Sequence, residues 1–237
     1  MEKNRVFRFK QFAVDDSLCA MKVGTDGVLL GAWAPVDGVR RVLDVGTGCG
    51  VIALMVAQRA PQALIDAIDI NTQAAQQAMA NFASSPWGER LSARQFDFNE
   101  LAATMSSTYD LVVCNPPFFA DGVMPPDDRR SLARHGTSLT LEQLLNGAER
   151  LLTPQGRLAM VTPVEARPLV MEHCAYHDLR VNGLTEVVPV EGRAPKRLLW
   201  LCSRMSTPLR ANVLVMTAQG SFTQPYVDLV RDFYLKM

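Results

Sequence analysis

The chain of 237 residues lacks the features that mark several classes of protein. Its 24 Lys and Arg residues balance its 24 Asp and Glu residues, so the overall charge does not by itself favour a polyanionic partner. No apolar run approaches the roughly 18 residues that a membrane-spanning helix needs, and the start of the chain has no apolar stretch typical of signal peptides. We therefore expect a cytoplasmic protein without a membrane partner.

Cysteine is scarce, and its spacing argues against cross-links. The chain has five cysteines, an odd number, and no two of them form a CxxC motif. We therefore expect neither a disulfide framework nor a zinc site, and we predict no metal. A thiol nucleophile would need a positioned histidine base, which the sequence does not single out. We interpret the cysteines as free, buried thiols: Cys19, Cys49, Cys114, Cys174 and Cys202.

Charge is unevenly distributed along the chain. Residues 1–10 carry four basic side chains and one acid, and residues 193–210 carry five basic side chains and no acid. Residues 41–115 are acidic, with four Arg against seven Asp and Glu. A polyanion needs only a local basic face, so the two ends are candidates for binding one. Solvated surface side chains would explain the same pattern.

The order of apolar runs predicts one α/β domain over residues 1–237. From residue 41 onward, short runs rich in β-branched residues alternate with helical segments, which is typical of βαβ units and a largely parallel sheet. The expected strands are Arg41–Val45, Leu64–Asp69, Leu91–Phe96, Asp110–Cys114 and Arg157–Thr162. The expected helices are Val51–Arg59, Thr72–Ala83, Thr140–Leu152 and Val164–His177, the last weakened by Pro168 near its start.

Both ends of the chain depart from this alternation. Three β-prone runs follow residue 178, and we expect an antiparallel hairpin that ends the sheet, before a helix over Tyr226–Leu235. Near the N-terminus, residues 6–14 are strand-like and Val28–Trp33 favours a short helix. The β-prone runs of the tail are Val181–Val190, Arg197–Cys202 and Asn212–Thr217.

A glycine-rich turn follows the first expected strand and opens a helix. It reads Gly46-Thr47-Gly48-Cys49-Gly50, and glycine there permits positive φ and close approach of a ligand to the backbone. The dinucleotide fingerprint G-x-G-x-x-G would require glycine at position 51, which is Val51, so NAD is disfavoured. With Asp44, the spacing D-x-G-x-G-x-G resembles motif I of the class I methyltransferases. That resemblance implies S-adenosylmethionine as cofactor and a Rossmann-like, largely parallel seven-stranded sheet with a C-terminal antiparallel hairpin.

Three acids lie near the carboxyl ends of expected strands, where ligands bind in open α/β sheets. Asp44 can complement the cationic groups of the cofactor, and the N-terminus of the following helix favours the carboxylate of the cofactor. Asp69 can accept hydrogen bonds from both ribose hydroxyls, and Asp97 from the adenine amino group. With Gly46, Gly48 and Gly50, these acids are candidate cofactor-binding residues. Alternatively they are strand-end acids, and Asp97 caps the next turn.

Asn115-Pro116-Pro117-Phe118 follows the strand that ends at Cys114. Two prolines cannot continue a central strand, so the chain must leave the sheet here. The motif resembles motif IV, [DNS]-P-P-[YFW], of amino-methyltransferases. The Asn115 side-chain oxygen and the Pro116 carbonyl would accept the two hydrogens of a planar amino group, and Phe118 would stack on its ring. We expect Asn115 also to contact the cofactor, although an N-P-P turn by itself is common.

Further segments together narrow the resemblance to one family. Ala20–Trp33, Asn115–Phe118, Ala133-Arg134-His135 and Arg193–Leu198, with the glycine loop, are similar to the bacterial tRNA1(Val) adenine-N6 methyltransferases, from Phe9 to Tyr234. The resemblance implies methylation of adenosine 37, next to the anticodon of the tRNA. It also implies an N-terminal extension, residues 1–36, packed on the cofactor side of a catalytic core of residues 37–237. The cofactor-binding residues expected from this extension are Lys22, Thr25 and Asp26.

An anticodon loop suits the charge pattern of the chain. A base in such a loop is already unpaired or easily splayed, so recognition can rest on loop shape and phosphates. For His135 the alternative is a structural hydrogen bond. The candidate nucleic-acid contacts are Arg5, Arg8, Lys10, Arg134, His135, Arg193, Lys196 and Arg197.

Three other functions remain open on the motifs alone. The same N-P-P-aromatic pocket serves protein-glutamine N5-methyltransferases and rRNA guanine-N2 methyltransferases. The glutamine enzymes normally carry a separate N-terminal helical domain, whereas only about 40 residues precede the glycine loop here. A non-catalytic adaptor that retains cofactor binding is the third alternative, and the intact motif at Asn115 argues against it.

Overall fold

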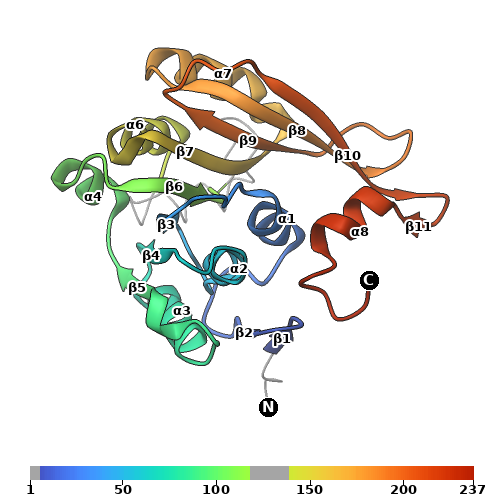
Figure 1. Ribbon diagram of the computed structural model, residues 1–237, viewed down its shortest axis with the longest axis horizontal. Helices are drawn as coiled ribbons and strands as arrows, with labels where there is room; N and C mark the ends of the chain where they lie inside the picture. The colour runs from blue at the N-terminus through green and yellow to red at the C-terminus, as the bar shows by residue number, and fades with distance from the viewer. Residues whose placement is uncertain (1–5, 118–138) are drawn as a thin grey trace, which may run out of the picture.

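A computed structural model describes residues 6–117 and 139–237. Its centre is a sheet of nine strands within the described residues, in the order β11-β10-β8-β9-β7-β6-β3-β4-β5 (Figure 1). The strands are β3 (Arg41–Val45), β4 (Leu64–Asp69), β5 (Leu91–Gln95), β6 (Tyr109–Cys114), β7 (Leu152–Pro163), β8 (Arg180–Val190), β9 (Arg197–Ser203), β10 (Arg210–Ala218) and β11 (Ser221–Phe222).

Helices cover both faces of the sheet. Helices α1, α2 and α3 contribute to the core on one face, and α4, α6 and α7 to the core on the other. The helices are α1 (Thr25–Trp33), α2 (Val51–Arg59), α3 (Thr72–Ala83), α4 (Phe98–Thr104), α6 (Leu141–Leu151), α7 (Arg167–Tyr176) and α8 (Gln224–Val230). None of the described helices is long and apolar enough to cross a membrane.

Alternation along the central strands places side chains in both cores. Val42 packs into the core under α1 and α2, whereas the adjacent Leu43 packs into the core under α4 and α6. Val113 and Cys114 divide in the same way on β6. Such strands are apolar throughout because a parallel sheet is buried on both faces. This explains why the runs could be recognised as strands in the sequence.

The α/β class and the largely parallel order are confirmed, but the count of seven strands is wrong. Strands β3 to β7 are parallel neighbours, and β9 lies antiparallel between β7 and β8. The expected antiparallel pairing of the tail is therefore present, as β8 with β9. It does not end the sheet, because β10 adds to the free edge of β8 in parallel and then pairs with β11. Pairing that edge satisfies backbone groups that would otherwise be exposed.

Several boundaries also differ from the expected ones. Pro168 lies in the first turn of α7, where proline is tolerated, after a 3-10 turn over Val164–Ala166. The short helix α4 was not expected, and the last helix ends at Val230 rather than Leu235. Residues beyond it return to the N-terminal segment.

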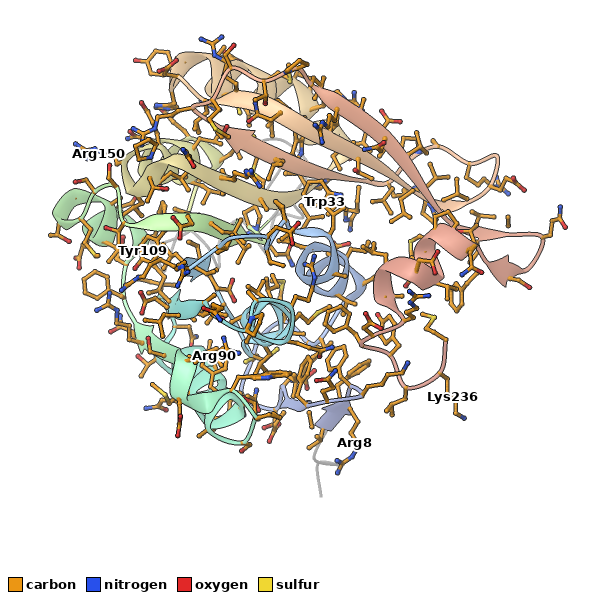
Figure 2. All side chains as sticks on the ribbon, in the orientation of Figure 1. Arg8, Trp33, Arg90, Tyr109, Arg150 and Lys236 are labelled. Carbon is orange, nitrogen blue, oxygen red and sulfur yellow. The ribbon has the colours of Figure 1, made fainter. Side chains whose placement is uncertain are left out.

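The N-terminal segment packs against the C-terminal end. Strands β1 (Val6–Arg8) and β2 (Ala13–Asp15) form a separate two-stranded sheet. Phe9 forms an isolated bridge with Tyr234, and its ring stacks on Phe12 at a centroid distance of 4.5 Å. Figure 2 labels Arg8 on this hairpin and Lys236 near the C-terminus. The division into an extension of residues 1–36 and a core of residues 37–237 stays a prediction.

Candidate functional site

A cavity of about 280 Å³ lies where the central parallel strands end. Register explains its position, because Val45 of β3 is paired with Ile68 of β4 and with Cys114 of β6. The next residue along each strand or loop is therefore at the same edge of the sheet. The described residues that line the cavity are Met21, Val45, Gly46, Ile68, Asp69, Ile70, Asp97, Phe98, Asn99, Cys114, Asn115, Pro117, Leu139 and Gln143.

The three glycines of the loop have positive φ but different surroundings. Gly46, Gly48 and Gly50 have φ of 67°, 56° and 82°. A Cβ on Gly46 or Gly48 would meet nothing within 4 Å, so both leave open space beside the backbone. A Cβ on Gly50 would lie 2.5 Å from Cε1 of Phe82. Gly50 is therefore required for packing against α3, whereas the first two glycines form a backbone cradle.

Asp44 supports the loop from beneath. Its side chain is fully buried, and Oδ2 accepts hydrogen bonds from Thr47 Oγ1 at 2.7 Å and the Ala53 amide at 3.2 Å. Burial raises the pKa of Asp44 to about 7 against the lowering by these two bonds, and the charge of Asp69 adds to the rise. Among the described residues, Oδ1 has no hydrogen-bond partner. A cationic ligand would favour the ionised form of this carboxyl.

Asp69 and Asp97 both line the cavity, and both accept hydrogen bonds from backbone amides. Asp69 accepts the Gly48 amide at 2.9 Å and the Asn71 amide at 2.8 Å. Asp97 is the N-cap of α4 and accepts the Asn99 amide at 2.6 Å. The capping interpretation of Asp97 is therefore confirmed, and its place in the cavity wall leaves a ligand contact compatible with it.

Asn115 presents an unused acceptor at the cavity. The residue is half-buried, and its Oδ1 atom is buried without a hydrogen-bond partner among the described residues. An unsatisfied buried amide oxygen is costly, which points to a donor supplied by a ligand. Pro117 also lines the cavity, whereas Pro116 is buried and is not among its described lining residues. Phe118 lies outside the described residues.

The predicted site residues before the glycine loop occupy other positions. Lys22, Thr25 and Asp26 are not among the described lining residues; Met21, which sequence reasoning missed, is. Lys22 donates to the Asp16 carbonyl at 2.7 Å, and Asp26 pairs with Arg197 Nε at 2.8 Å. These contacts shape the segment and tie α1 to β9.

The predicted nucleic-acid residues have varied surroundings. Arg8, Arg193 and Lys196 are exposed, and the exposed Lys10 donates through Nζ to the Arg231 carbonyl at 2.6 Å. Arg197 is half-buried in its ion pair with Asp26. Arg5, Arg134 and His135 lie outside the described residues.

Two lining residues in and just before α6 had no sequence signal. Leu139 and Gln143 lie far along the chain from the glycine and N-P-P motifs, and Gln143 is recognisable only as part of a capping box with Thr140. The remaining unpredicted lining residues lie within two positions of motif residues, as Val45 and Cys114 do.

The thiol interpretation is confirmed. All five cysteines are free and buried. Cys174 and Cys202 lie with their sulfur atoms 3.7 Å apart. Within residues 6–117 and 139–237, no cluster of three or more His, Cys, Asp and Glu side chains could hold a metal ion.

Comparison with known proteins identifies the family. Residues 23–174 match the methyltransferase small domain family. The chain is 43% identical over 239 residues to a tRNA1(Val) (adenine(37)-N6)-methyltransferase of Aeromonas hydrophila, covering all of both chains. It is 42% identical over 236 residues to the protein of the same name from Parabacteroides distasonis, covering 99% of each. This chain belongs to the tRNA1(Val) (adenine(37)-N6)-methyltransferase family.

Solved structures show the same fold. A protein of Agrobacterium tumefaciens described as a predicted O-methyltransferase superposes with a TM-score of 0.71 at 19% identity, covering 88% of this chain and 96% of that one. A ribosomal protein L11 methylase from Lactobacillus delbrueckii gives a TM-score of 0.56 at 19% identity, covering 81% and 83%. The class I methyltransferase fold is thus confirmed.

This family member is an S-adenosylmethionine-dependent methyltransferase, as predicted. The residues present fit the cofactor on three observations. Gly46 and Gly48 leave an open backbone cradle, Asp44 keeps a buried oxygen without a partner among the described residues, and Asp69 lines the cavity beside the loop. Carboxylates and exposed backbone amides are the groups that an amino acid, a ribose and a sulfonium require.

Proposed function

We propose that this protein transfers the methyl group of S-adenosylmethionine to N6 of adenosine 37 in the anticodon loop of tRNA1(Val). The observation that carries the proposal is the buried Asn115 Oδ1, without a partner in the described residues, at the cavity of a chain 43% identical to a relative with that named activity. A tRNA substrate supports the proposal that the protein acts in the cytoplasm.

The proposed cofactor site uses the edge of the sheet. The open backbone at Gly46 and Gly48 would accommodate the amino-acid end, Asp69 would accept from the ribose hydroxyls, and Asp97 would accept from the adenine amino group. Asp44 supports the loop and balances positive charge. We further propose residues 1–36 as an extension on the same side, with Lys22, Thr25 and Asp26 as cofactor contacts; the position of Met21 in the cavity wall supports this. When bound, the cofactor supplies an electrophilic methyl group on sulfur.

Asn115 prepares the nucleophile in this proposal. The lone pair of an adenine amino nitrogen is delocalised into the ring, so the nitrogen is a poor nucleophile. Asn115 Oδ1 and the Pro116 carbonyl accept its two hydrogens and favour a pyramidal nitrogen, and Pro116 has no N–H to compete. Bound S-adenosylmethionine would supply an electrophilic methyl carbon to this nitrogen; the carbon–sulfur electron pair would stay on sulfur as a thioether leaving group, and the proton lost from nitrogen would pass to solvent. Phe118 provides a stacking face for the base.

Most of the rate then comes from positioning. Holding nitrogen, methyl and sulfur in line at near-attack distance lowers the barrier without a strong base. An anticodon loop presents an unpaired base, so little energy is spent in extracting it. The exposed Arg8, Arg193 and Lys196, with Lys10, are the proposed phosphate contacts. Arg197, held by Asp26, positions the β9 end of this region.

Nucleoside mass spectrometry tests the proposal. The protein, S-adenosylmethionine and an unmodified tRNA1(Val) transcript are expected to yield N6-methyladenosine, and a transcript with guanosine at position 37 is expected to yield none. Appearance of N2-methylguanosine, or transfer only to a release factor, would support the guanine or glutamine alternatives instead. Because the relatives are named for adenine N6, those two alternatives are less supported.

A pair of asparagine variants tests the assigned pocket. Asn115→Ala is expected to lower kcat by 100-fold or more, because both alignment and nitrogen activation depend on its oxygen. Asn212→Ala is the matched control, since Asn212 is exposed on β10 near the sheet edge. Equal methyl transfer by Asn115→Ala and the control would exclude the pocket, and would leave a different amino-group site to be found.

A further inference from the structure

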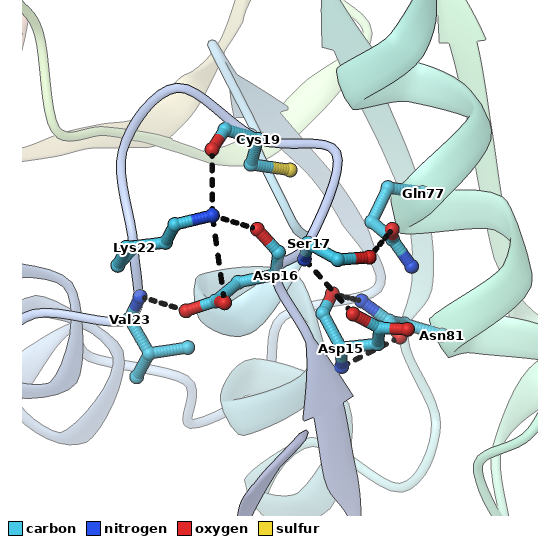
Figure 3. A network of polar contacts seen from close by, with 8 residues as sticks. All are labelled: Asp15, Asp16, Ser17, Cys19, Lys22, Val23, Gln77 and Asn81. Carbon is cyan, nitrogen blue, oxygen red and sulfur yellow. Dashed lines mark hydrogen bonds and ion pairs between the residues drawn. The ribbon is translucent and has the colours of Figure 1, made fainter. Parts of the chain in front are cut away.

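The segment Asp15–Val23 is closed on itself by side-chain bonds. Asp16 Oδ2 accepts the Val23 amide at 3.0 Å, and Lys22 Nζ donates to the carbonyls of Asp16 and Cys19 at 2.7 and 3.2 Å (Figure 3). Lys22 also forms an ion pair with Asp16 Oδ1 at 3.8 Å. The segment therefore behaves as a preformed loop, and through Met21 it lines the cavity.

One buried amide joins this loop to the glycine loop. Asn81 lies in the last turn of α3 and is 5% exposed. Its Nδ2 donates to the Asp15 carbonyl and to the Cys49 carbonyl, both at 2.8 Å. Its Oδ1 accepts the Asp15 amide at 3.0 Å. A single side chain thus connects three segments, and Figure 3 shows its two bonds to Asp15.

Two further contacts join the segment Asp15–Val23 to α3 and to the glycine loop. Ser17 Oγ donates to Gln77 Oε1 at 3.3 Å, one helical turn before Asn81 on α3. The buried Cys19 thiol lies beside the buried Cys49 thiol, so the segment and the glycine loop are neighbours at a second point. The thiols are weak hydrogen-bonding groups, so the amide of Asn81 is the stronger connection.

We propose that Asn81 is a positioning residue for cofactor binding, which seats the segment Asp15–Val23 on the glycine loop so that Met21 closes one wall of the cavity. The amide suits this role because it offers two donors and an acceptor at one position. A carboxylate of the same shape cannot donate, and it would face the carbonyl oxygens of Asp15 and Cys49. Both the segment Asp15–Val23 and the glycine loop would then lose the hydrogen bond that Nδ2 of Asn81 donates to them. The inference rests on the proposed cofactor site and is independent of the RNA substrate.

Binding of S-adenosylmethionine to purified protein without RNA provides the test. Asn81→Asp is expected to weaken the calorimetric affinity at least tenfold, and to raise KM for the cofactor more than it lowers kcat. Trypsin cleavage after Lys22 is expected to accelerate, because the released segment exposes that bond. Gln76→Glu, the same amide-to-acid change on the exposed side of α3, is the matched control and is expected to leave all three measurements unchanged.

Met21→Ala keeps the test decisive if Asn81→Asp does not fold. Met21 is 62% exposed, so its truncation cannot empty a core, yet it is expected to weaken cofactor affinity several-fold. Unchanged affinity in both variants would overturn the inference. So would an Asn81→Asp protein with a lower Tm but normal affinity and normal cleavage at Lys22, because its role would then be structural only. Loss of adenine methylation with normal cofactor binding would count against the proposed function instead.

Discussion

Asp44 carries an energetic cost that can be measured as a function of pH. Burial raises its pKa from 3.8 to about 7. At about 1.4 kcal/mol for each pKa unit, the ionised carboxyl lowers the free energy of unfolding by roughly 4 kcal/mol. Below pH 4 the carboxyl is protonated in both states and costs nothing. As pH rises toward 7 the unfolded state ionises first, so the folded state loses stability, and the loss is complete above pH 7. Asp44→Asn removes this dependence.

We therefore expect the free energy of unfolding of Asp44→Asn, minus that of the wild type, to increase as pH rises. From pH 5 to 7 the gain is expected to be roughly 2–3 kcal/mol. Urea unfolding of cofactor-free protein, followed by tryptophan fluorescence between pH 5 and 8, measures it. Losses that do not depend on ionisation shift the difference equally at every pH. The slope therefore reports the titration of Asp44 itself, including the lowering of its pKa by the bonds from Thr47 and Ala53.

Two controls sharpen the experiment. Asp178→Asn removes one charge from a side chain that is 73% exposed, and so accounts for the change in net charge. Thr47→Val removes the hydrogen bond that lowers the pKa of Asp44, and is expected to extend the loss of stability to higher pH. A difference between Asp44→Asn and the wild type that does not vary with pH would refute the reasoning.

Further predictions separate fold from ligand contacts. Gly50→Ala is expected to destabilise the protein by more than about 2 kcal/mol in urea unfolding, because its methyl meets Phe82 at positive φ. Gly46→Ala is expected to cost only about 1 kcal/mol yet to weaken cofactor binding in calorimetry; the reverse order would refute the cradle. Asp97→Ala is expected to lose about 1 kcal/mol of stability and cofactor affinity, whereas Asp97→Ser restores only the stability. Recovery of affinity in Asp97→Ser would exclude the adenine contact.

Local sequence determined the elements that lie around the glycine loop. The bounds of β3, β4, α2 and α3 agree with those expected from the sequence. Each is a strong local pattern, either an apolar β-branched run or a helical run without breakers, and it ends at residues whose backbone preference stops it. Gly50, in the left-handed region, is the N-cap residue that precedes α2, and Asn71 caps α3 through its side chain.

Weaker local signals gave wrong boundaries in the tail. The run Asn212–Thr217 was recognisable as β-prone, but nothing local states which edge it joins or in which direction. Its parallel pairing with β8 depends on the free edge that β8 presents after β9 has inserted beside β7. Strand count is therefore a property of the assembled sheet.

Parallel register explains how much of the site the sequence could determine. Gly46, Asp69, Asp97 and Asn115 each lie at or just beyond the carboxyl end of a strand. Parallel strands bring these ends to one edge, so the gathering of the residues was predictable from order alone. The chemistry of a nitrogen-methylating pocket likewise follows from residue types at these strand ends.

Only the tertiary structure decided which side chains hold those residues in place. Asn81 is one amide in a helix rich in polar residues, and no spacing distinguishes it until α3 packs between the segment Asp15–Val23 and the glycine loop. Asp26, a predicted cofactor contact, is held by Arg197, which lies 171 residues away in the sequence. Sequence motifs identify the residues that contact a ligand. The buried polar partners of those residues depend on which surfaces are packed together in the folded chain.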